Sequence, residues 1–237
     1  MKNAIILCSG GLDSVVCANY IKKKLNYDRL IFLFFDYGQR TLSVERRFSK
    51  RCAKSLNGNF LEIKIDHFVG KESLINSSRD PKKIKRSNLR DSKKESEKYY
   101  VPNRNGIFIN YAISLTEILS IKEKKIFDIF VGFNSEGSEA YPDATLEFVD
   151  KMNEVMKIMK LKGMVVAPLI KKDKNEIVRL GLDLEIDFRD TFSCYIDNKI
   201  HCGVCLACRL RQEAFYWANV VDPTSYKERM RDFRLAK

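Results

Sequence analysis

The sequence predicts an α/β fold built on a doubly wound parallel sheet, and three observations support this prediction. Short apolar runs alternate with segments of helical spacing along most of the chain. The run at 30–35 is continuously apolar, which is typical of a parallel strand covered on both faces. Two strand–helix–strand units follow one another in the first 65 residues, and such units form parallel sheets with right-handed crossovers.

The elements follow from the apolar spacing in chain order. In the first part we expect a strand at 4–7, a helix from Leu12, a strand at 30–35, a helix at 41–56 and a strand at 60–65. In the second part we expect a helix at 105–119, a strand at 126–133, a helix at 143–159, a strand at 164–169 and a helix opened by a capping box at Asp173–Glu176.

Bulk properties indicate one full-sized domain with a small appendage. The chain has 237 residues, of which 45% are hydrophobic and 31% charged, as in ordinary globular proteins. No apolar run approaches the roughly 18 residues that cross a bilayer. The first strand begins too early for a signal peptide. We therefore expect a cytoplasmic protein without a membrane partner, with an α/β domain at 1–192 and a distinct segment at 193–237.

The net charge of +12 favours anionic partners, but part of it lies in one segment. Residues 79–98 contain nine Lys or Arg against four Asp or Glu and few aliphatic residues. This composition predicts a solvated, charged insertion. A nucleic-acid-binding arm is the alternative, although no aromatic residues interleave the basic ones to stack on bases.

The seven cysteines divide into three and four. Cys8, Cys17 and Cys52 are scattered through apolar patterns. The other four fall within fifteen residues, and four thiolates are the number that a closed tetrahedral zinc site requires. Iron–sulfur ligation is the main alternative, and His201 is a further candidate ligand. The clustered residues are Cys194, Cys202, Cys205 and Cys208.

The segment Ser9-Gly10-Gly11-Leu12-Asp13-Ser14 joins the first strand to the first helix. A helix N-terminus carries unpaired N–H groups and attracts anions, and glycines let the backbone approach a phosphate closely. Asp13 can hold Mg²⁺ beside that anion. The segment lacks the Gly-Lys-Ser/Thr ending of a Walker A loop. A glycine-rich turn with a helix cap is the alternative interpretation.

Three further patches follow predicted strands or precede a helix at the carboxyl edge of the sheet, where such folds bind ligands. They are Phe35–Arg40, Tyr100–Asn105 and Gly132–Asn134 with Tyr141–Asp143. The Ser-Gly-Gly-x-Asp-Ser segment resembles the signature of PP-loop ATP pyrophosphatases. Together with the three patches and the cysteines, the match from Ala4 to Arg211 resembles the 7-cyano-7-deazaguanine synthase family. The residues around Tyr141 are closer to archaeal-type members.

The resemblance implies an adenine-nucleotide-hydrolase-like fold and an ATP-dependent C–N ligase. The implied substrates are 7-carboxy-7-deazaguanine, ammonia and ATP with Mg²⁺, and the product is 7-cyano-7-deazaguanine for queuosine or archaeosine in tRNA. It favours one structural zinc ion over iron, held by a small C-terminal helical segment. It also implies a homodimer, and stable tRNA binding is not expected.

The resemblance also carries residue roles. Asp13, Arg104 and Asp143 are the expected catalytic residues, and Arg104, Asn105 and Asp143 the expected substrate contacts. Arg104 suits a substrate carboxylate or a phosphate because its fork pairs with either. Asp143 suits the N–H edge of the base, or alternatively a helix N-cap. The expected ATP-binding residues are Cys8, Ser9, Gly10, Gly11, Leu12, Asp13, Ser14, Asp36 and Gln39.

Two alternatives stay open on sequence grounds. The first is another PP-loop enzyme that acts on tRNA by thiolation or lysidine formation, which would bind tRNA in a salt-sensitive way. The second is a related enzyme that uses the same activation to join a deazaguanine to a protein amine. A zinc-ribbon nucleic-acid-binding module without catalysis leaves the Ser-Gly-Gly-x-Asp-Ser loop unexplained.

Overall fold

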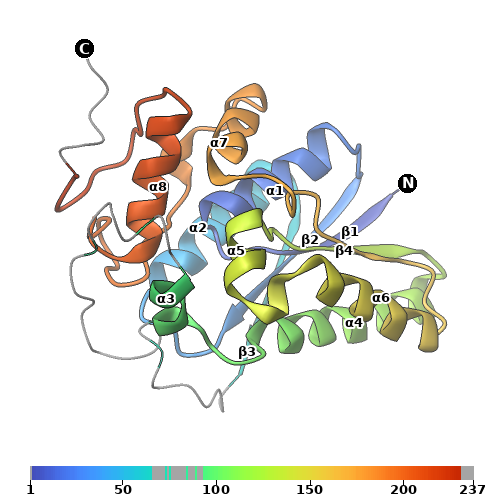
Figure 1. The fold of residues 1–237 in the computed structure, drawn as a ribbon. Coiled ribbons are helices and arrows are strands. Elements are labelled where there is room, and N and C mark those ends of the chain that lie inside the picture. Colours follow the sequence, from blue (N-terminus) through green and yellow to red (C-terminus); the bar gives the residue numbers. More distant parts are fainter. Residues whose placement is uncertain are drawn as a thin grey trace.

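The computed structural model describes residues 2–65, 73, 75, 84, 89 and 93–230. Within them, five parallel strands form one sheet in the order β3-β2-β1-β4-β5. Helices α1, α2 and α7 cover one face of this sheet, and α4 and α6 cover the other (Figure 1). The predicted doubly wound α/β architecture is therefore confirmed.

The strands and helices have the following bounds. The strands are β1 Asn3–Leu7, β2 Arg29–Asp36, β3 Asn59–Lys64, β4 Phe127–Phe130 and β5 Val165–Val166. The helices are α1 Leu12–Lys23, α2 Leu42–Ser55, α3 Lys93–Ser96, α4 Arg104–Glu123, α5 Ser135–Ala140, α6 Leu146–Ile158, α7 Lys174–Asp183 and α8 Leu206–Trp217. Short 3₁₀ turns lie at Glu97–Tyr99, Pro142–Ala144 and Phe188–Asp190.

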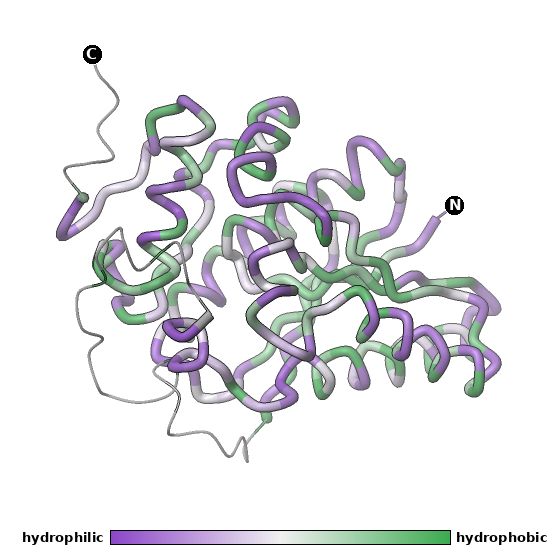
Figure 2. The backbone as a smooth tube through the Cα atoms, viewed as in Figure 1, coloured by the Kyte–Doolittle hydropathy of each residue, from purple (hydrophilic) through white to green (hydrophobic). Residues whose placement is uncertain are grey.

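Two apolar cores lie on opposite faces of the sheet. Along β1, Ala4 and Ile6 point to one face and Ile5 to the other, because successive side chains of a strand alternate. The first face packs against α1, α2, α7 and α8, and the second against α4 and α6. The apolar colour in Figure 2 accordingly concentrates on the central strands. The buried run of β2 confirms the parallel-strand interpretation.

The last strand is shorter than the sequence predicts. Apolar residues continue from 164 to 169, but only Val165 and Val166 pair with β4. On its other side, the Asn153 side chain accepts a hydrogen bond from Val165 N at 2.7 Å and donates one to Val165 O at 2.9 Å. The Asn153 side chain thus occupies the N–H and C=O groups of Val165 that a sixth strand would need for pairing. No further strand can therefore pair with the sheet at Val165.

Helix starts show which capping predictions hold. The capping box of Asp173 and Glu176 opens α7 as predicted. The helix expected at 143–159 begins only at Leu146, and its N-cap is Thr145, whose hydroxyl accepts from Phe148 N at 3.0 Å. The alternative interpretation of Asp143 as the N-cap is therefore wrong. The polar helix α5 was not predicted, because it has no apolar spacing.

The charged insertion at 79–98 lies largely outside the described residues. Ile84 and Leu89 are described, and both are buried in the core that α4 and α6 share. Tyr99, just beyond the insertion, is also buried there. The interpretation of a wholly solvated insertion therefore does not hold at Ile84 and Leu89.

The C-terminal segment is anchored to the α/β core by a buried ion pair. Arg211 of α8 donates its five N–H groups to the side chains of Asp222, Thr191 and Ser193 and to Phe188 O, at 2.7 to 3.3 Å. Burial opposes the charge of Asp222, but Arg211 and neighbouring hydroxyls outweigh it and lower the pKa of this carboxyl. The boundary predicted at 192 stays a prediction.

Replacing Asp222 with asparagine is expected to lower the free energy of unfolding by about 3–5 kcal/mol, because Arg211 would keep its buried charge without a partner. A lowered native pKa stabilises the fold above the ordinary pKa of aspartate, about 3.9, and this contribution is lost as the pH falls through the native value. The variant should lose this acid-dependent part of its stability. Thermal unfolding of both proteins between about pH 7 and pH 2 measures the difference.

The matched control is Asp187→Asn, which breaks the exposed pair of Asp187 with Arg189. Exposed pairs contribute little because water and salt screen them. Equal melting temperatures for the Asp222 variant and wild type would contradict the anchoring role.

Candidate active site and metal centre

The predicted phosphate loop connects β1 to α1 and is fixed on two sides. Gly10 has a φ of +77°, which favours glycine, and a Cβ there would lie 2.7 Å from Phe48 Cβ. Ser49 donates its hydroxyl to Cys8 O at 2.8 Å, and Phe192 N donates to Gly10 O at 3.0 Å. The first N–H groups of α1 are thus held at the carboxyl end of the sheet, where an anion can bind.

The loop hydroxyls bind one another and the loop backbone. Ser14 Oγ donates to Gly11 O at 3.0 Å and lies 3.4 Å from Ser9 Oγ. Gly11 N donates to Ser9 Oγ at 3.3 Å, and Gly11 is the N-cap of α1. These contacts keep both hydroxyls beside the helix N-terminus, where they can donate to phosphate oxygens after rotation.

A lysine that sequence reasoning assigned only to a capping segment completes this end of the site. Lys174, the first residue of α7, places Nζ 2.8 Å from Asp13 Oδ2 and 3.6 Å from Glu136 Oε2. Burial opposes the charge of Lys174, but the two carboxylates outweigh it and raise its pKa. Burial also raises the pKa of Glu136, and Lys174 partly offsets that effect. The local sequence has no signal for this contact, which joins residues 161 positions apart.

Each of the two acidic side chains has one oxygen without a hydrogen bond. Asp13 Oδ1 and Glu136 Oε2 are shielded from solvent and accept no hydrogen bond from any described residue, although Lys174 Nζ lies 3.6 Å from Glu136 Oε2. Carboxylate oxygens are the ligands that Mg²⁺ prefers. The donor set therefore fits a divalent cation beside the phosphate loop.

A cavity of about 270 Å³ opens in front of this loop. It lies over the carboxyl ends of β1, β2 and β4, at the point where the strand order reverses direction. Ligands of doubly wound folds bind at this switch point. Of the predicted site residues, the structure brings Cys8, Ser9, Gly11, Leu12, Asp13, Ser14, Arg104, Asn105 and Cys194 together in its wall.

Another part of the cavity wall is formed by Arg104 and two aromatic rings. Arg104 Nη1 donates to the Tyr37 hydroxyl at 3.2 Å, and the guanidinium lies over the rings of Tyr37 and Phe108. Its Nε is buried and has no hydrogen-bond partner in the described part of the chain. A planar cation with an unused donor at a cavity wall can bind a carboxylate or a phosphate.

Asp143 lies behind this wall. One of its oxygens accepts from Asn105 N at 2.9 Å, so Asp143 holds the first turn of α4 and thereby Arg104. A smaller hollow beside the main cavity is lined by Arg104, Asn105, Asp143 and Tyr195, among others. The predicted contact of Asp143 with a base edge stays a prediction.

Three of the predicted ATP-binding residues do not line the cavity. Asp36 forms an ion pair with Arg46 at 3.4 Å and accepts from Gly38 N. Gln39 is buried, with its amide held by Phe35 O and Tyr37 N. Gly10 also lies outside the lining but shapes the phosphate loop. Any role of Asp36 and Gln39 in nucleotide binding stays a prediction.

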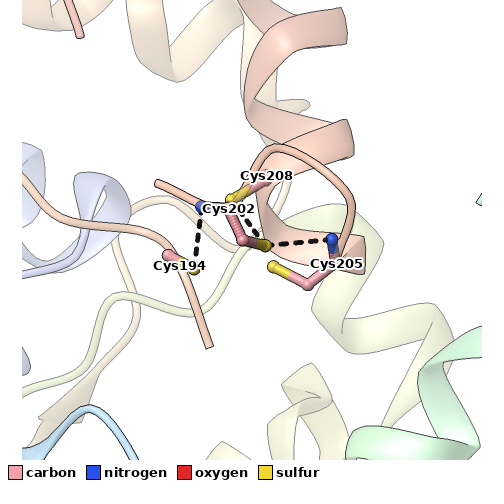
Figure 3. Close-up of side chains that lie close together, drawn as sticks. All are labelled: Cys194, Cys202, Cys205 and Cys208. Atoms are coloured by element: carbon pink, nitrogen blue, oxygen red, sulfur yellow. Dashed lines mark hydrogen bonds between the residues drawn. The ribbon is translucent and has the colours of Figure 1, made fainter. Parts of the chain in front are cut away.

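The four clustered cysteines meet at the start of α8, with all four Sγ atoms within 4.8 Å of one another (Figure 3). Cys202 Sγ and Cys208 Sγ are 3.9 Å apart. A tetrahedral ion with Zn–S bonds of about 2.3 Å places its sulfurs about 3.8 Å apart, so the spacing fits one ion. Four buried thiols without disulfides form a metal-binding donor set.

Backbone N–H groups point at two of the sulfurs, as expected for thiolates. Cys194 Sγ accepts from the N–H groups of residues 196, 197 and 202, and Cys202 Sγ accepts from those of residues 204 and 205, all at 3.3 to 3.4 Å. Gly203, with φ +81°, forms the turn between them. His201 Nε2 instead accepts from Ser193 N at 3.0 Å, so His201 is outside the ligand set.

None of the helices in the described part of the chain combines the length and the apolar character that a bilayer crossing demands.

Comparisons with known proteins match the chain over nearly its whole length. The model of the family described as queuosine biosynthesis protein QueC matches residues 3–219. The 7-cyano-7-deazaguanine synthase of Methanococcus maripaludis strain C6 is 36% identical and covers 94% of this chain and 98% of its own length. The enzyme of the same name from Methanothermobacter thermautotrophicus is 31% identical, and the match covers 95% of this chain and 99% of that enzyme. The one from Campylobacter concisus is 33% identical, and the match covers 96% of this chain and 100% of that enzyme.

Proposed function

Because the chain belongs to the QueC family of queuosine biosynthesis proteins, we propose that it is a 7-cyano-7-deazaguanine synthase that converts 7-carboxy-7-deazaguanine and ammonia with ATP. One observation carries the proposal. A phosphate loop and an arginine with an unused N–H donor line the same cavity. The arrangement suits a reaction in which a substrate carboxylate must reach a nucleotide phosphate.

The phosphate end would hold ATP. The N–H groups at the start of α1 and the hydroxyls of Ser9 and Ser14 would bind the pyrophosphate part. Asp13 would hold Mg²⁺ with it, and Glu136 offers a second oxygen on the same side. Bound Mg²⁺ would neutralise charge on the leaving pyrophosphate. Lys174 fixes both carboxylates and adds a positive charge to the wall.

The arginine end would hold the deazaguanine carboxylate. Arg104 would align one carboxylate oxygen with the α-phosphorus, so that a new P–O bond forms while the bond to pyrophosphate breaks. Ammonia then attacks the acyl carbon and displaces AMP, which gives an amide. The amide oxygen then attacks the α-phosphorus of a second ATP, and pyrophosphate leaves again. AMP departs with that oxygen, the nitrogen loses its remaining protons, and the nitrile forms. Positioning of this kind lowers the barrier by removing the entropy cost of encounter.

The four thiolates would hold one zinc ion with a structural role. Four protein ligands fill a tetrahedral site and leave no position for substrate. Cys194 belongs both to the ligand set and to the cavity wall, so the metal would also fix part of that wall. Metal analysis of the purified protein distinguishes zinc from iron with labile sulfide.

The proposed function is tested by mass spectrometry of products from 7-carboxy-7-deazaguanine, ammonium and Mg-ATP. We expect the amide and then the nitrile, with AMP and pyrophosphate released. Formation of ADP without AMP would contradict adenylation. If the deazaguanine is instead transferred to a protein amine and no free nitrile forms, the protein is the related enzyme that joins a deazaguanine to a protein.

A further inference from the structure

Glu45 is a carboxyl in the cavity wall that the proposed reaction does not use. It lies near the start of α2. Its Oε1 accepts from the Thr41 hydroxyl at 2.5 Å, and its Oε2 accepts from Gln39 Nε2 at 3.2 Å. Gln39 in turn is held by the backbone of Phe35 and Tyr37. The carboxylate is therefore fixed in one orientation before any ligand binds.

Glu45 is linked to Arg104 through two intervening residues. Gln39 donates to Glu45 and accepts from Tyr37 N at 3.0 Å, and the Tyr37 hydroxyl accepts from Arg104 Nη1 at 3.2 Å. Lys174 at the phosphate end interacts instead with Asp13 and Glu136. No ion pair joins Arg104 to Glu45 in the described part of the chain. A cation and an anion thus line one cavity without a direct ion pair between them.

The surroundings of Glu45 disfavour the ionised form of its carboxyl group. Burial raises the pKa of its carboxyl, and the hydrogen bonds from Thr41 and Gln39 with the charge of Arg104 only partly counter this. A ligand that donates N–H groups to it would supply the missing stabilisation. Such a ligand must also offer an anionic group to Arg104.

A carboxylated deazaguanine combines these two properties. It has an anionic carboxylate on its five-membered ring, and N–H and amino donors on the opposite, six-membered side. We propose that Glu45 is a specificity-determining residue that accepts the N–H and 2-amino groups of the base, an assignment that rests on the proposed function. The ribose of ATP also offers two donors, but the hydrogen-bonded path from Glu45 through Gln39 and Tyr37 to Arg104 favours the base.

The test compares Glu45→Gln with wild type in binding and in steady-state kinetics. Glutamine keeps the size of the side chain but loses the charge and one acceptor. We expect Kd and KM for 7-carboxy-7-deazaguanine to rise about 10- to 100-fold, as for loss of hydrogen bonds to a charged group. KM for ATP should stay within about threefold, a change of less than about 0.7 kcal/mol. The matched control is Glu147→Gln, an exposed residue of α6.

An analogue that lacks the 2-amino group separates recognition from structure. Wild type should bind this analogue much more weakly than the deazaguanine, whereas Glu45→Gln should bind the two more equally. Unchanged discrimination, or an equal loss for both compounds with a lower melting temperature, would overturn the assignment in favour of a structural role. A raised KM for ATP alone would overturn it in favour of the ribose.

Failure of the proposed function gives a different result. If wild type binds the deazaguanine but forms no nitrile, the reaction is wrong, and the Kd contrast between the two proteins still decides the role of Glu45. If wild type does not bind the deazaguanine at all, both assignments fall.

Discussion

Replacing Cys205 with serine is expected to empty the four-cysteine site and to loosen the chain after Ser193. Four thiolates binding zinc supply on the order of 10 kcal/mol of apparent free energy, which is comparable to the stability of a whole domain. Cys205 is the N-cap of α8, and its sulfur lies within 4.8 Å of the other three. Metal analysis should show a fall from one equivalent towards zero, and limited proteolysis should cut the segment beyond the sheet.

Activity should fall with the metal, because the loop from Ser193 to Tyr195 and part of α8 form one wall of the cavity. Cys17→Ala is the matched control. Cys17 is also a buried cysteine, but it packs against the opposite face of the sheet from the metal site. The Cys17→Ala variant should keep its metal and its protease resistance. A Cys205 variant that retained one equivalent of metal and full activity would show that the cluster does not act as a four-ligand site.

Replacing Asp13 with asparagine is expected to lower kcat at least about 100-fold while the protein stays folded, comparable to the loss of one preorganised charged or hydrogen-bonding group at a transition state. The substitution keeps the size of the side chain but removes the charge that would hold Mg²⁺ beside pyrophosphate. Lys174 would keep Glu136 as a partner, so folding should survive. Steady-state rates at saturating substrates and a melting curve measure the two effects.

Asp183→Asn is the matched control for this prediction. Asp183 is exposed at the far end of α7, the helix that begins with Lys174. The kcat of the Asp183→Asn variant should match that of wild type. Retention of more than about a tenth of the wild-type rate by the Asp13 variant, a barrier change under about 1.4 kcal/mol, would refute the metal role of this residue.

The sequence alone determined the features that are encoded by neighbouring residues. Continuous apolar runs predicted the parallel strands, because a strand covered on both faces must be apolar on both. The phosphate loop could be predicted because its hydroxyls, glycines and carboxylate follow one another between a strand and a helix. The four-cysteine metal site could be predicted for the same reason. Short spacing in the chain keeps such groups close in any fold that contains the segment.

Only the tertiary structure decided which distant residues complete the site. Lys174 and Glu136 meet Asp13 because α7 and α5 both begin above the same edge of the sheet. Glu45 and Arg104 line the same cavity because α2 and α4 both begin at that edge. Asp143 holds the start of α4, and Gln39 supports Glu45 from outside the cavity wall. Strand order and crossover direction set these contacts, and neither leaves a periodic signal in the sequence around each residue.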